Sequence, residues 1–214
     1  MKKMKKVGRF HVITDTVLQT CRSHAELAAL AIAGGADTIQ LREKSGSTRD
    51  MIRAAERMQA LCRKAGVTFV VNDRVDVAIA SGADGVHLGQ DDFPIPLARK
   101  LLGEKAIIGG SAGNIEEARK CVEEGADYIG FGPVYPTGSK ADAAPASGLD
   151  LLRRVVKAVP LPIVAIGGIS LGNASVVMNT GVYGIAVISA VCCQPDPAEA
   201  ARSLVACIGV CPDA

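Results

Sequence analysis

The sequence contains few aromatic residues, and this scarcity narrows the classes of fold that it can form. Only 3% of its 214 residues are aromatic and none is tryptophan, whereas Ala, Val, Ile, Leu and Gly are numerous. Aliphatic residues in such number are typical of layered α/β proteins, whose parallel sheets are buried on both faces. With 49% hydrophobic and 21% charged residues, the chain can bury a sizeable core, in one large domain or two small ones.

A strong net charge and ligand-spaced cysteines are also lacking. The formal net charge of +2 argues against a general electrostatic attraction to nucleic acid or to membranes. The seven cysteines show neither CxxC nor Cys/His ligand spacing, so we expect free, mostly buried thiols in a reducing cytosol. No hydrophobic run follows the basic segment 1–8, which predicts a solvated tail rather than a signal peptide or a membrane span. We therefore expect a cytoplasmic protein.

Short apolar runs recur along the chain and are the expected strands. Most are continuously apolar, as in parallel strands that are covered on both faces. They lie at 10–13, 38–41, 68–71, 85–88, 106–108, 128–131, 163–166 and 184–188.

Helical patterns separate these runs. Ser23 and Glu26 form a capping box, and Asn114 and Asp196 are further N-cap candidates. After Ser47, helical spacing predicts a buried face of Ile52, Ala55, Met58 and Leu61.

A short repeat marks the turns from helix to strand. The pattern Gly-Ala-Asp-x-[Ile/Val] occurs at 35–39, 82–86 and 125–129, with a fainter copy at 181–185. Each Gly stands where a helix should end in the left-handed conformation. Eight βα units predict a single (β/α)8 TIM barrel over residues 9–214, and an open doubly wound sheet is the alternative. The longest connection, Pro133 to Ser147, is expected to be an active-site loop.

The expected strand ends carry the polar residues, and barrel enzymes place their chemistry at these ends. On the strand at 38–41 and its continuation, alternation puts Gln40, Arg42 and Lys44 on one face, which would be costly to bury without an anionic ligand. Asp73 and Asp92 follow two neighbouring strands and could hold a hard divalent cation such as Mg²⁺, although each could instead cap a helix.

Two anion sites are predicted from the same rim. Arg42, Lys44 and a loop lysine, Lys140, could hold a diphosphate. The Gly167-Gly168 pair and Ile188-Ser189 fit a cradle for a single phosphate group. His87 lies in the middle of a strand, where we expect a satisfied histidine of the barrel interior.

These segments, taken together, resemble the thiamine-phosphate synthase family. The motifs that carry the resemblance cover nearly the whole chain and are VITD at 12–15, QLREK at 40–44, VNDR at 71–74, VHLGQDD at 86–92, GPVYPT at 132–137 with Lys140, and AIGGI at 165–169. The resemblance implies a (β/α)8 barrel that joins the diphosphate of a hydroxymethylpyrimidine to a thiazole phosphate. It also implies Mg²⁺ and a dissociative mechanism. Diphosphate would leave first, and the thiazole nitrogen would then capture the pyrimidine methylene cation.

The resemblance also implies a role for individual residues, with Arg42, Lys44, Ser111 and Lys140 as the catalytic set. The residues that would bind the pyrimidine diphosphate are Gln40, Leu41, Arg42, Glu43, Lys44, Asn72, Ser111 and Lys140. Those that would bind the thiazole phosphate are Thr137, Gly138, Ser139, Gly168, Ile188 and Ser189. Asp73 and Asp92 would hold Mg²⁺. Glu43 should point toward the helices and support the site without touching the substrate.

The sequence departs from the family pattern at one position, and three alternative functions stay open. Family members often carry His two positions after Ser111, where this chain has Gly113. Related thiazole tautomerases use that His and tend to lose the Asp and Lys residues that are present here. A non-catalytic phosphate-sensing barrel would lack the metal carboxylates, and a phosphosugar isomerase would want Glu43 as a base. The expected partners are small-molecule substrates, and a homodimer stays open.

Overall fold

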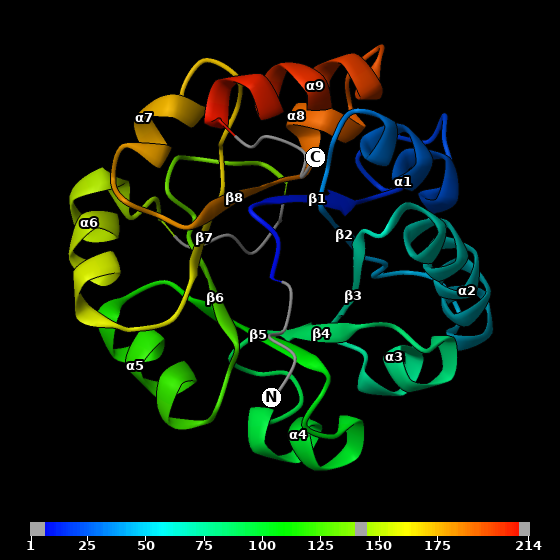
Figure 1. The fold of residues 1–214 in the computed structure, drawn as a ribbon, viewed down its shortest axis with the longest axis horizontal. Coiled ribbons are helices and arrows are strands. Elements are labelled where there is room, and N and C mark those ends of the chain that lie inside the picture. The colour runs from blue at the N-terminus through cyan, green and yellow to red at the C-terminus, as the bar shows by residue number, and fades with distance from the viewer. Residues whose placement is uncertain (1–6, 140–144, 210–214) are drawn as a thin grey trace.

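A computed structural model of the protein describes residues 7–139 and 145–209. Within these residues, eight parallel strands pair in chain order and close into a barrel, which confirms the (β/α)8 prediction (Figure 1). The strands are β1 Phe10–Thr14, β2 Thr38–Leu41, β3 Thr68–Asn72, β4 Gly85–Leu88, β5 Ile107–Ala112, β6 Tyr128–Phe131, β7 Ile163–Ile166 and β8 Gly184–Val187. β1 closes the ring by pairing with β8, Val12 opposite Val187.

Helices follow the strands and form an outer ring around the barrel (Figure 1). They are α1 His24–Ala33, α2 Thr48–Ala65, α3 Val75–Ser81, α4 Ile95–Leu102, α5 Ile115–Glu123, α6 Gly148–Ala158, α7 Ala174–Met178, α8 Ser189–Cys192 and α9 Pro197–Ile208. The predicted caps are confirmed: Ser23 and Glu26 form the capping box of α1, and the side chains of Asn114 and Asp196 accept backbone N–H groups of α5 and α9. No described helix is long and apolar enough to cross a membrane.

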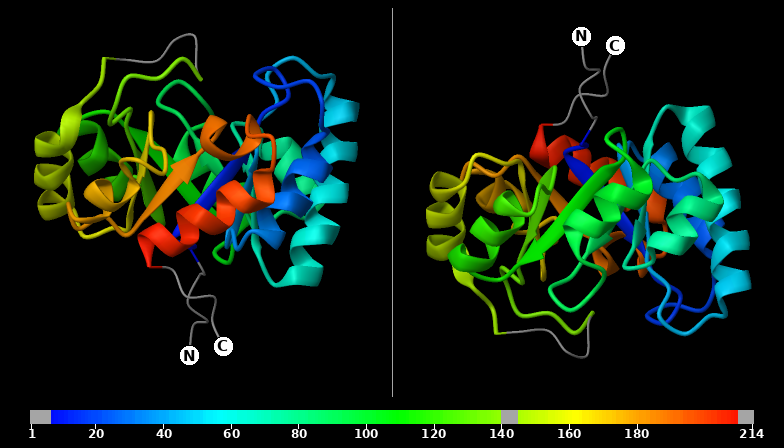
Figure 2. Two further views of the ribbon diagram at one scale, coloured as in Figure 1. Left: turned by 90° about the horizontal axis from the view of Figure 1, so that it is seen from above. Right: turned by 90° about the horizontal axis from the view of Figure 1, so that it is seen from below.

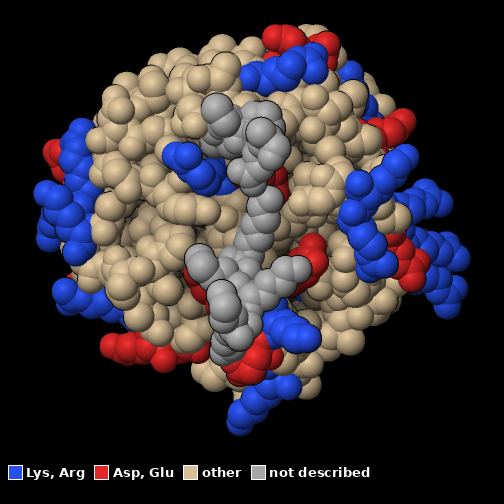
Figure 3. All heavy atoms as spheres, in the orientation of Figure 1, with Lys and Arg blue, Asp and Glu red and all other residues tan. Residues whose placement is uncertain are grey.

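The buried face of α2 differs from the predicted one. Ala55 and Met58 are buried as expected, but Met51 and Cys62 complete the stripe, while Ile52 and Leu61 are only partly covered. Positions 51, 55, 58 and 62 are spaced by four, three and four residues, so they form one continuous stripe on the side of the helix that faces the strands. Charged side chains occupy the outer surface, and Lys and Arg gather over α2 and α6 at opposite edges of the molecule (Figure 3).

The Gly-Ala-Asp repeats close one end of the barrel, which we call the floor. Gly35, Gly82, Gly125 and Gly181 all have positive φ, from +65° to +94°, as predicted for helix ends. The Asp of each full repeat accepts backbone N–H groups where the preceding strand begins, and these residues are Asp37 at β1, Asp84 at β3 and Asp127 at β5. The repeat is therefore structural, because it satisfies amides that have no partner within their own strand.

The core has two layers, as expected of a filled barrel. The larger cluster lies between strands and helices, and a smaller one lies inside the barrel around Ile13, Tyr128 and Val164. Val7 packs against this inner cluster and Gly8 is buried, so the structure corrects the predicted tail: its last two residues belong to the floor. Figure 2 shows the start of β1 at this end, with the segment after β6 at the opposite end, the rim. The six described cysteines are free thiols, of which three are buried.

Candidate active site

A cavity of about 610 Å³ opens at the rim, where the carboxyl ends of the strands converge. Most of the predicted site residues line it, and these are Arg42, Lys44, Asn72, Asp73, Asp92, Ser111, Thr137, Ser139, Gly168, Ile188 and Ser189. A void of about 30 Å³ lies below it inside the barrel and is lined by Gln40, Arg42 and His87 among others. The structure therefore brings the two predicted anion sites and the carboxylate pair into one space.

Three of the predicted residues that the structure describes line neither cavity. Leu41 packs in the core between strands and helices, so only its backbone could face a ligand. Glu43 and Gly138 are not among the lining residues of either cavity in the described part of the chain. Lys140 lies outside the described residues.

Arg42 is the most constrained cation of the site. Its Nη1 donates to the Oδ2 of Asp15, whose side chain is 2% exposed. The Oδ1 of Asp15 accepts the N–H groups of Val17 and Leu18 at 2.8 and 3.0 Å, which holds the carboxylate in the turn after β1. The Nε of Arg42 is buried and has no hydrogen-bond partner among the described residues. An unpaired buried donor is costly, so the site is suited to a ligand that brings an acceptor.

Lys44, Asp73 and Asp92 form the charged edge of the cavity. Lys44 Nζ donates to Asp73 Oδ2 at 2.5 Å, and Gly89 N donates to Asp92 Oδ2 at 2.7 Å. Burial raises the pKa of Asp92, and its hydrogen bond with Asp73 raises the pKa further. Two carboxylates that share one site destabilise each other unless a cation stands beside them. Asp73 also has a φ of +62°, unusual for a residue other than glycine, and this turn directs its side chain to the rim.

Glu43 organises the loop behind these cations. Its Oε1 accepts the N–H groups of Ser45 and Gly46 at 2.8 and 3.2 Å, and its Oε2 lies 3.3 Å from His24 Nε2. Burial alone would raise the pKa of Glu43, but the hydrogen bonds from Ser45, His24 and Gly46 outweigh it and lower the pKa to about 2. The carboxylate is therefore charged at neutral pH and hydrogen-bonded within the protein, and its supporting role stays a prediction.

The segment after β6 packs onto the glycine pair after β7. Gly167 and Gly168 have φ of +98° and +64°, and a Cβ on Gly168 would stand 2.6 Å from the carbonyl oxygen of Pro136. Ser139 Oγ lies 3.5 Å from Ser189 Oγ, and Ser139 N donates to Thr137 Oγ1 at 3.2 Å. The residues predicted for a single phosphate group thus come together from three strand ends.

The departure at Gly113 leaves space at the cavity wall. A Cβ on Gly113 would meet only ordinary contacts, 3.6 Å from Glu117 Oε2 and 3.7 Å from the carbonyl oxygen of Gly132. Gly113 N donates to Glu117 Oε2 at 2.7 Å, so the carboxylate holds the turn after β5 by its backbone. The described cavity wall therefore has no imidazole at this position.

Sequence reasoning missed Asp15 as a member of the site. It stood at an expected strand end, next to Thr14, but nothing local showed that its partner would be Arg42, 27 residues away. Because β1 and β2 pair in register, Thr14 opposite Leu41, the residues that follow them meet at the rim.

Among the described residues, no three His, Cys, Asp or Glu side chains come together as a metal site.

Known proteins similar to this chain were found by sequence and by structure. The family model for thiamine monophosphate synthase matches residues 10–191. The thiamine-phosphate synthase of Methanocella arvoryzae is 56% identical over 198 residues, which cover 92% of this chain and 93% of that protein. That of Chloroflexus aurantiacus is 52% identical over 202 residues, covering 94% and 93%. The solved structure of thiamine phosphate pyrophosphorylase from Pyrococcus furiosus superposes with a TM-score of 0.87 at 43% identity, covering 94% of this chain and 95% of that one.

Proposed function

The chain belongs to the thiamine-phosphate synthase family, and from that premise we propose how its rim cavity carries out the reaction. The protein is a transferase of thiamine biosynthesis that condenses the pyrimidine diphosphate with thiazole phosphate, giving thiamine phosphate and diphosphate. The observation that carries the site proposal is the juxtaposition of Arg42, with its unpartnered buried Nε, and the Asp73–Asp92 pair. Cations and carboxylates at one edge are what a metal-bound diphosphate requires.

The donor set fits Mg²⁺. Asp73 and Asp92 offer carboxylate oxygens, the ligands that Mg²⁺ prefers, and two of them leave room for substrate phosphate oxygens and water. When bound, Mg²⁺ would neutralise the charge that develops on the departing diphosphate. Lys44, which pairs with Asp73 in this structure, would then turn to the diphosphate as a second cation.

The protein's part in the reaction is positioning and charge stabilisation. Arg42, held by Asp15, is fixed before substrate arrives, so little reorganisation is needed as diphosphate leaves. Asn72 and Ser111 line the wall beside it, and we assign them with Gln40 to the pyrimidine diphosphate. Thr137, Ser139 and Ser189 with the backbone of Gly168 would hold the thiazole phosphate across the cavity. With the two phosphate groups held in this way, the thiazole would face the carbon that loses diphosphate.

The alternatives are less consistent with the site. A tautomerase would place an imidazole where Gly113 stands, and a phosphate-sensing barrel would lack the carboxylates. As an isomerase base, Glu43 is unsuited, because a pKa of about 2 is far from the operating pH. We further propose that the enzyme acts in the cytoplasm, and that it is a homodimer, which sedimentation would test.

The decisive experiment is reconstitution from purified components. The wild-type protein with both precursors and Mg²⁺ should form thiamine phosphate and diphosphate in equal amounts, and a chelator should stop the reaction. Asp73→Ala and Asp92→Ala should each lower kcat/KM at least about 100-fold, since each removes a ligand that acts on developing charge.

The matched control is Asp150→Ala on α6, whose side chain is 98% exposed and does not line the cavity. It should leave kcat/KM unchanged, and all three variants should melt cooperatively. Near-full activity in both rim variants would refute the metal assignment, whereas absence of product with wild-type protein would refute the function itself.

A further inference from the structure

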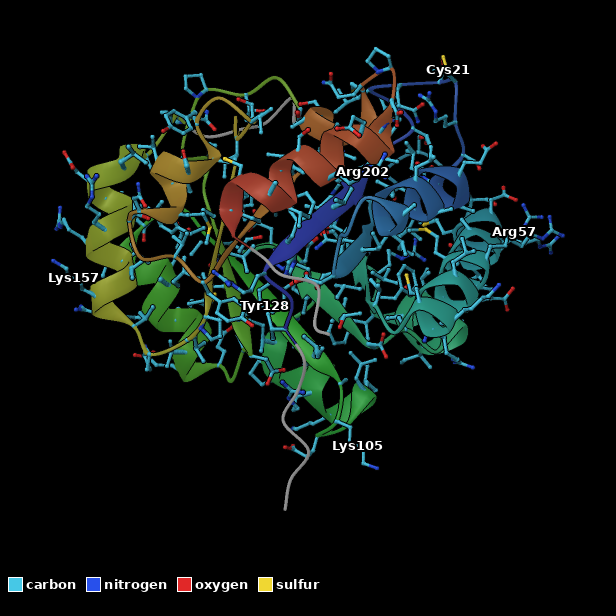
Figure 4. The ribbon with its side chains drawn as sticks, turned by 45° about the horizontal axis from the view of Figure 1, so that its top comes forward. Cys21, Arg57, Lys105, Tyr128, Lys157 and Arg202 are labelled. Atoms are coloured by element: carbon cyan, nitrogen blue, oxygen red, sulfur yellow. The ribbon has the colours of Figure 1, made fainter. Side chains whose placement is uncertain are left out.

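A partly buried chain of hydrogen bonds runs from the barrel interior up to the cavity wall. The hydroxyl of Tyr128 lies 3.0 Å from His87 Nδ1, and His87 Nε2 lies 3.0 Å from Ser111 Oγ. Tyr128 is 1% exposed and occupies the middle of the barrel, whereas Arg57, Lys157 and Arg202 project from the helices (Figure 4). Ser111 lines the rim cavity and Tyr128 lines only the small void below it, so the chain of hydrogen bonds connects the barrel interior to the cavity wall.

Two glycines make space for this chain. A Cβ on Gly109 would stand 2.2 Å from Tyr128 Cζ and 2.4 Å from His87 Nδ1, and one on Gly130 would stand 2.8 Å from His87 Cε1. Both glycines lie inside strands and neither has a positive φ, so the backbone does not demand glycine there. Glycine within a strand has a cost, which the space for the Tyr128–His87 contact explains.

The tyrosine is also held from below. The ring of His11 meets that of Tyr128 edge-on, with centroids 5.4 Å apart at 61°, and His11 Nε2 lies 2.9 Å from the carbonyl oxygen of Gly8. Burial raises the pKa of Tyr128, and a hydrogen bond from the Gln40 side chain acts in the opposite direction. These contacts hold the ring of Tyr128 so that its hydroxyl oxygen lies within hydrogen-bonding distance of His87 Nδ1.

The protons in this chain can be assigned. Burial raises the pKa of Tyr128, so its hydroxyl is protonated at neutral pH and can donate to His87 Nδ1. In that arrangement the imidazole would carry its proton on Nε2, and this N–H would donate a hydrogen bond to Ser111 Oγ. With its oxygen accepting from His87, Ser111 directs its own hydrogen into the cavity. In the opposite tautomer, Ser111 would donate to His87 and turn a lone pair toward an anionic ligand.

We propose that Tyr128 is a positioning residue, which fixes His87 as the Nε2–H tautomer and thereby aims the Ser111 hydroxyl hydrogen at the pyrimidine diphosphate. The orientation of Ser111 toward the substrate rests on the proposed function. The tautomer of His87 does not, because it is a property of the protein alone.

The first test reads the tautomer directly. The chain has three histidines, so ¹⁵N-labelled protein gives a simple imidazole spectrum, in which His11→Gln and His24→Gln identify the His87 signals by elimination. At a pH that keeps the ring neutral, wild-type His87 should show a protonated Nε2, and Tyr128→Phe should shift it toward a mixture of tautomers. A protonated Nδ1 in the wild type, or identical His87 signals in Tyr128→Phe, would overturn the proposal even if the enzyme is active.

The second test separates the two substrates. Tyr128→Phe should lower kcat/KM for the pyrimidine diphosphate about fivefold to tenfold, the effect of one neutral hydrogen bond, and leave the KM for thiazole phosphate unchanged. Gly130→Ala keeps every hydrogen-bonding group but displaces the His87 ring, so it should reproduce this selective loss.

Tyr183→Phe is the control, since it removes a hydroxyl that bonds the carbonyl oxygen of Val7 at the floor. It should leave both substrates unaffected. Equal losses for both substrates in Tyr128→Phe, or no loss, would contradict the positioning role. If the wild type forms no product, the function fails and the tautomer measurement still decides the assignment of protons.

Discussion

At the floor of the barrel, Asp37, Asp84 and Asp127 accept backbone N–H groups, whereas at the rim Asp15 and Asp73 face the cations Arg42 and Lys44. Aspartate thus holds backbone amides at the floor, whereas at the rim it also positions the cations of the candidate site. On the floor, each of these carboxylates accepts a backbone N–H at the start of a strand, and Asp127 in addition pairs with Arg99. At the rim, the arrangements differ from strand to strand, and groups are left for a ligand to satisfy, such as the Nε of Arg42.

The difference shows how the protein separates stability from function. A floor that repeats one turn can be built without reference to the substrate, because its amides need an acceptor in any barrel. The rim holds two adjacent carboxylates and two cations, and their interactions are complete only when a charged ligand or ion binds. Substitutions at the floor should therefore affect unfolding, and those at the rim should affect turnover.

Among the substitutions that compare the floor with the rim outside the carboxylate pair, releasing Arg42 should have the largest effect. Asp15→Asn keeps the shape of the side chain but removes the charge that holds the guanidinium, so kcat/KM for the pyrimidine diphosphate should fall about 10-fold to 100-fold. Steady-state kinetics with each substrate varied in turn measures this. The matched control is Asp76→Asn, which removes the partner of Arg74 in an exposed ion pair. Comparable kinetics for the two variants would remove Asp15 from the site.

A substitution at the floor should change stability and leave turnover unaffected. Asp37→Ala leaves the N–H groups of Arg9 and Phe10 without their acceptor, and the free energy of unfolding should fall by about 2 kcal/mol. Urea denaturation measures the change, with kcat per folded molecule as the second reading. Unchanged stability, or a loss of kcat in the folded protein, would contradict the claim that the floor serves stability and the rim serves turnover.

The smallest effect is a dependence of stability on pH that comes from Glu43. Its pKa is about 2 in the folded protein and 4.5 ordinarily, so its contribution is fully present above pH 4.5 and is lost as pH falls toward 2. Glu43→Gln should lower the free energy of unfolding at neutral pH by about 1 kcal/mol. Denaturation across this pH range should show the two proteins converging in acid. A constant difference would mean that charge plays no part.

Much of this molecule could be predicted from local sequence. Continuous apolar runs such as 68–71 mark buried parallel strands whatever surrounds them. Ser23 with Glu26 caps a helix through atoms three residues apart, and Gly82 ends one because only glycine adopts positive φ without strain. The rim residues followed from the rule that parallel strands bring their carboxyl ends together.

Other features depended on contacts between distant segments. The stripe that α2 buries was predicted one position off at Met51 and Cys62, because periodicity defines a face but packing chooses its rotation. Val7 and Gly8 joined the floor through neighbours from the other end of the chain, among them Tyr183, which local composition does not reveal. Binding of Mg²⁺ by Asp73 and Asp92, and of diphosphate by Lys140, stays a prediction.

By itself, the sequence determined the strands, the turns, the caps and the set of polar residues that reach the rim, since each rests on interactions within a few residues. Only the tertiary structure decided which of these residues meet. Closing the barrel paired Arg42 with Asp15 across β1 and β2, and brought Tyr128 to His87 over 41 residues of chain. The physical reason is that ion pairs and buried hydrogen bonds depend on distance in space, which chain order does not specify until the strands are in register.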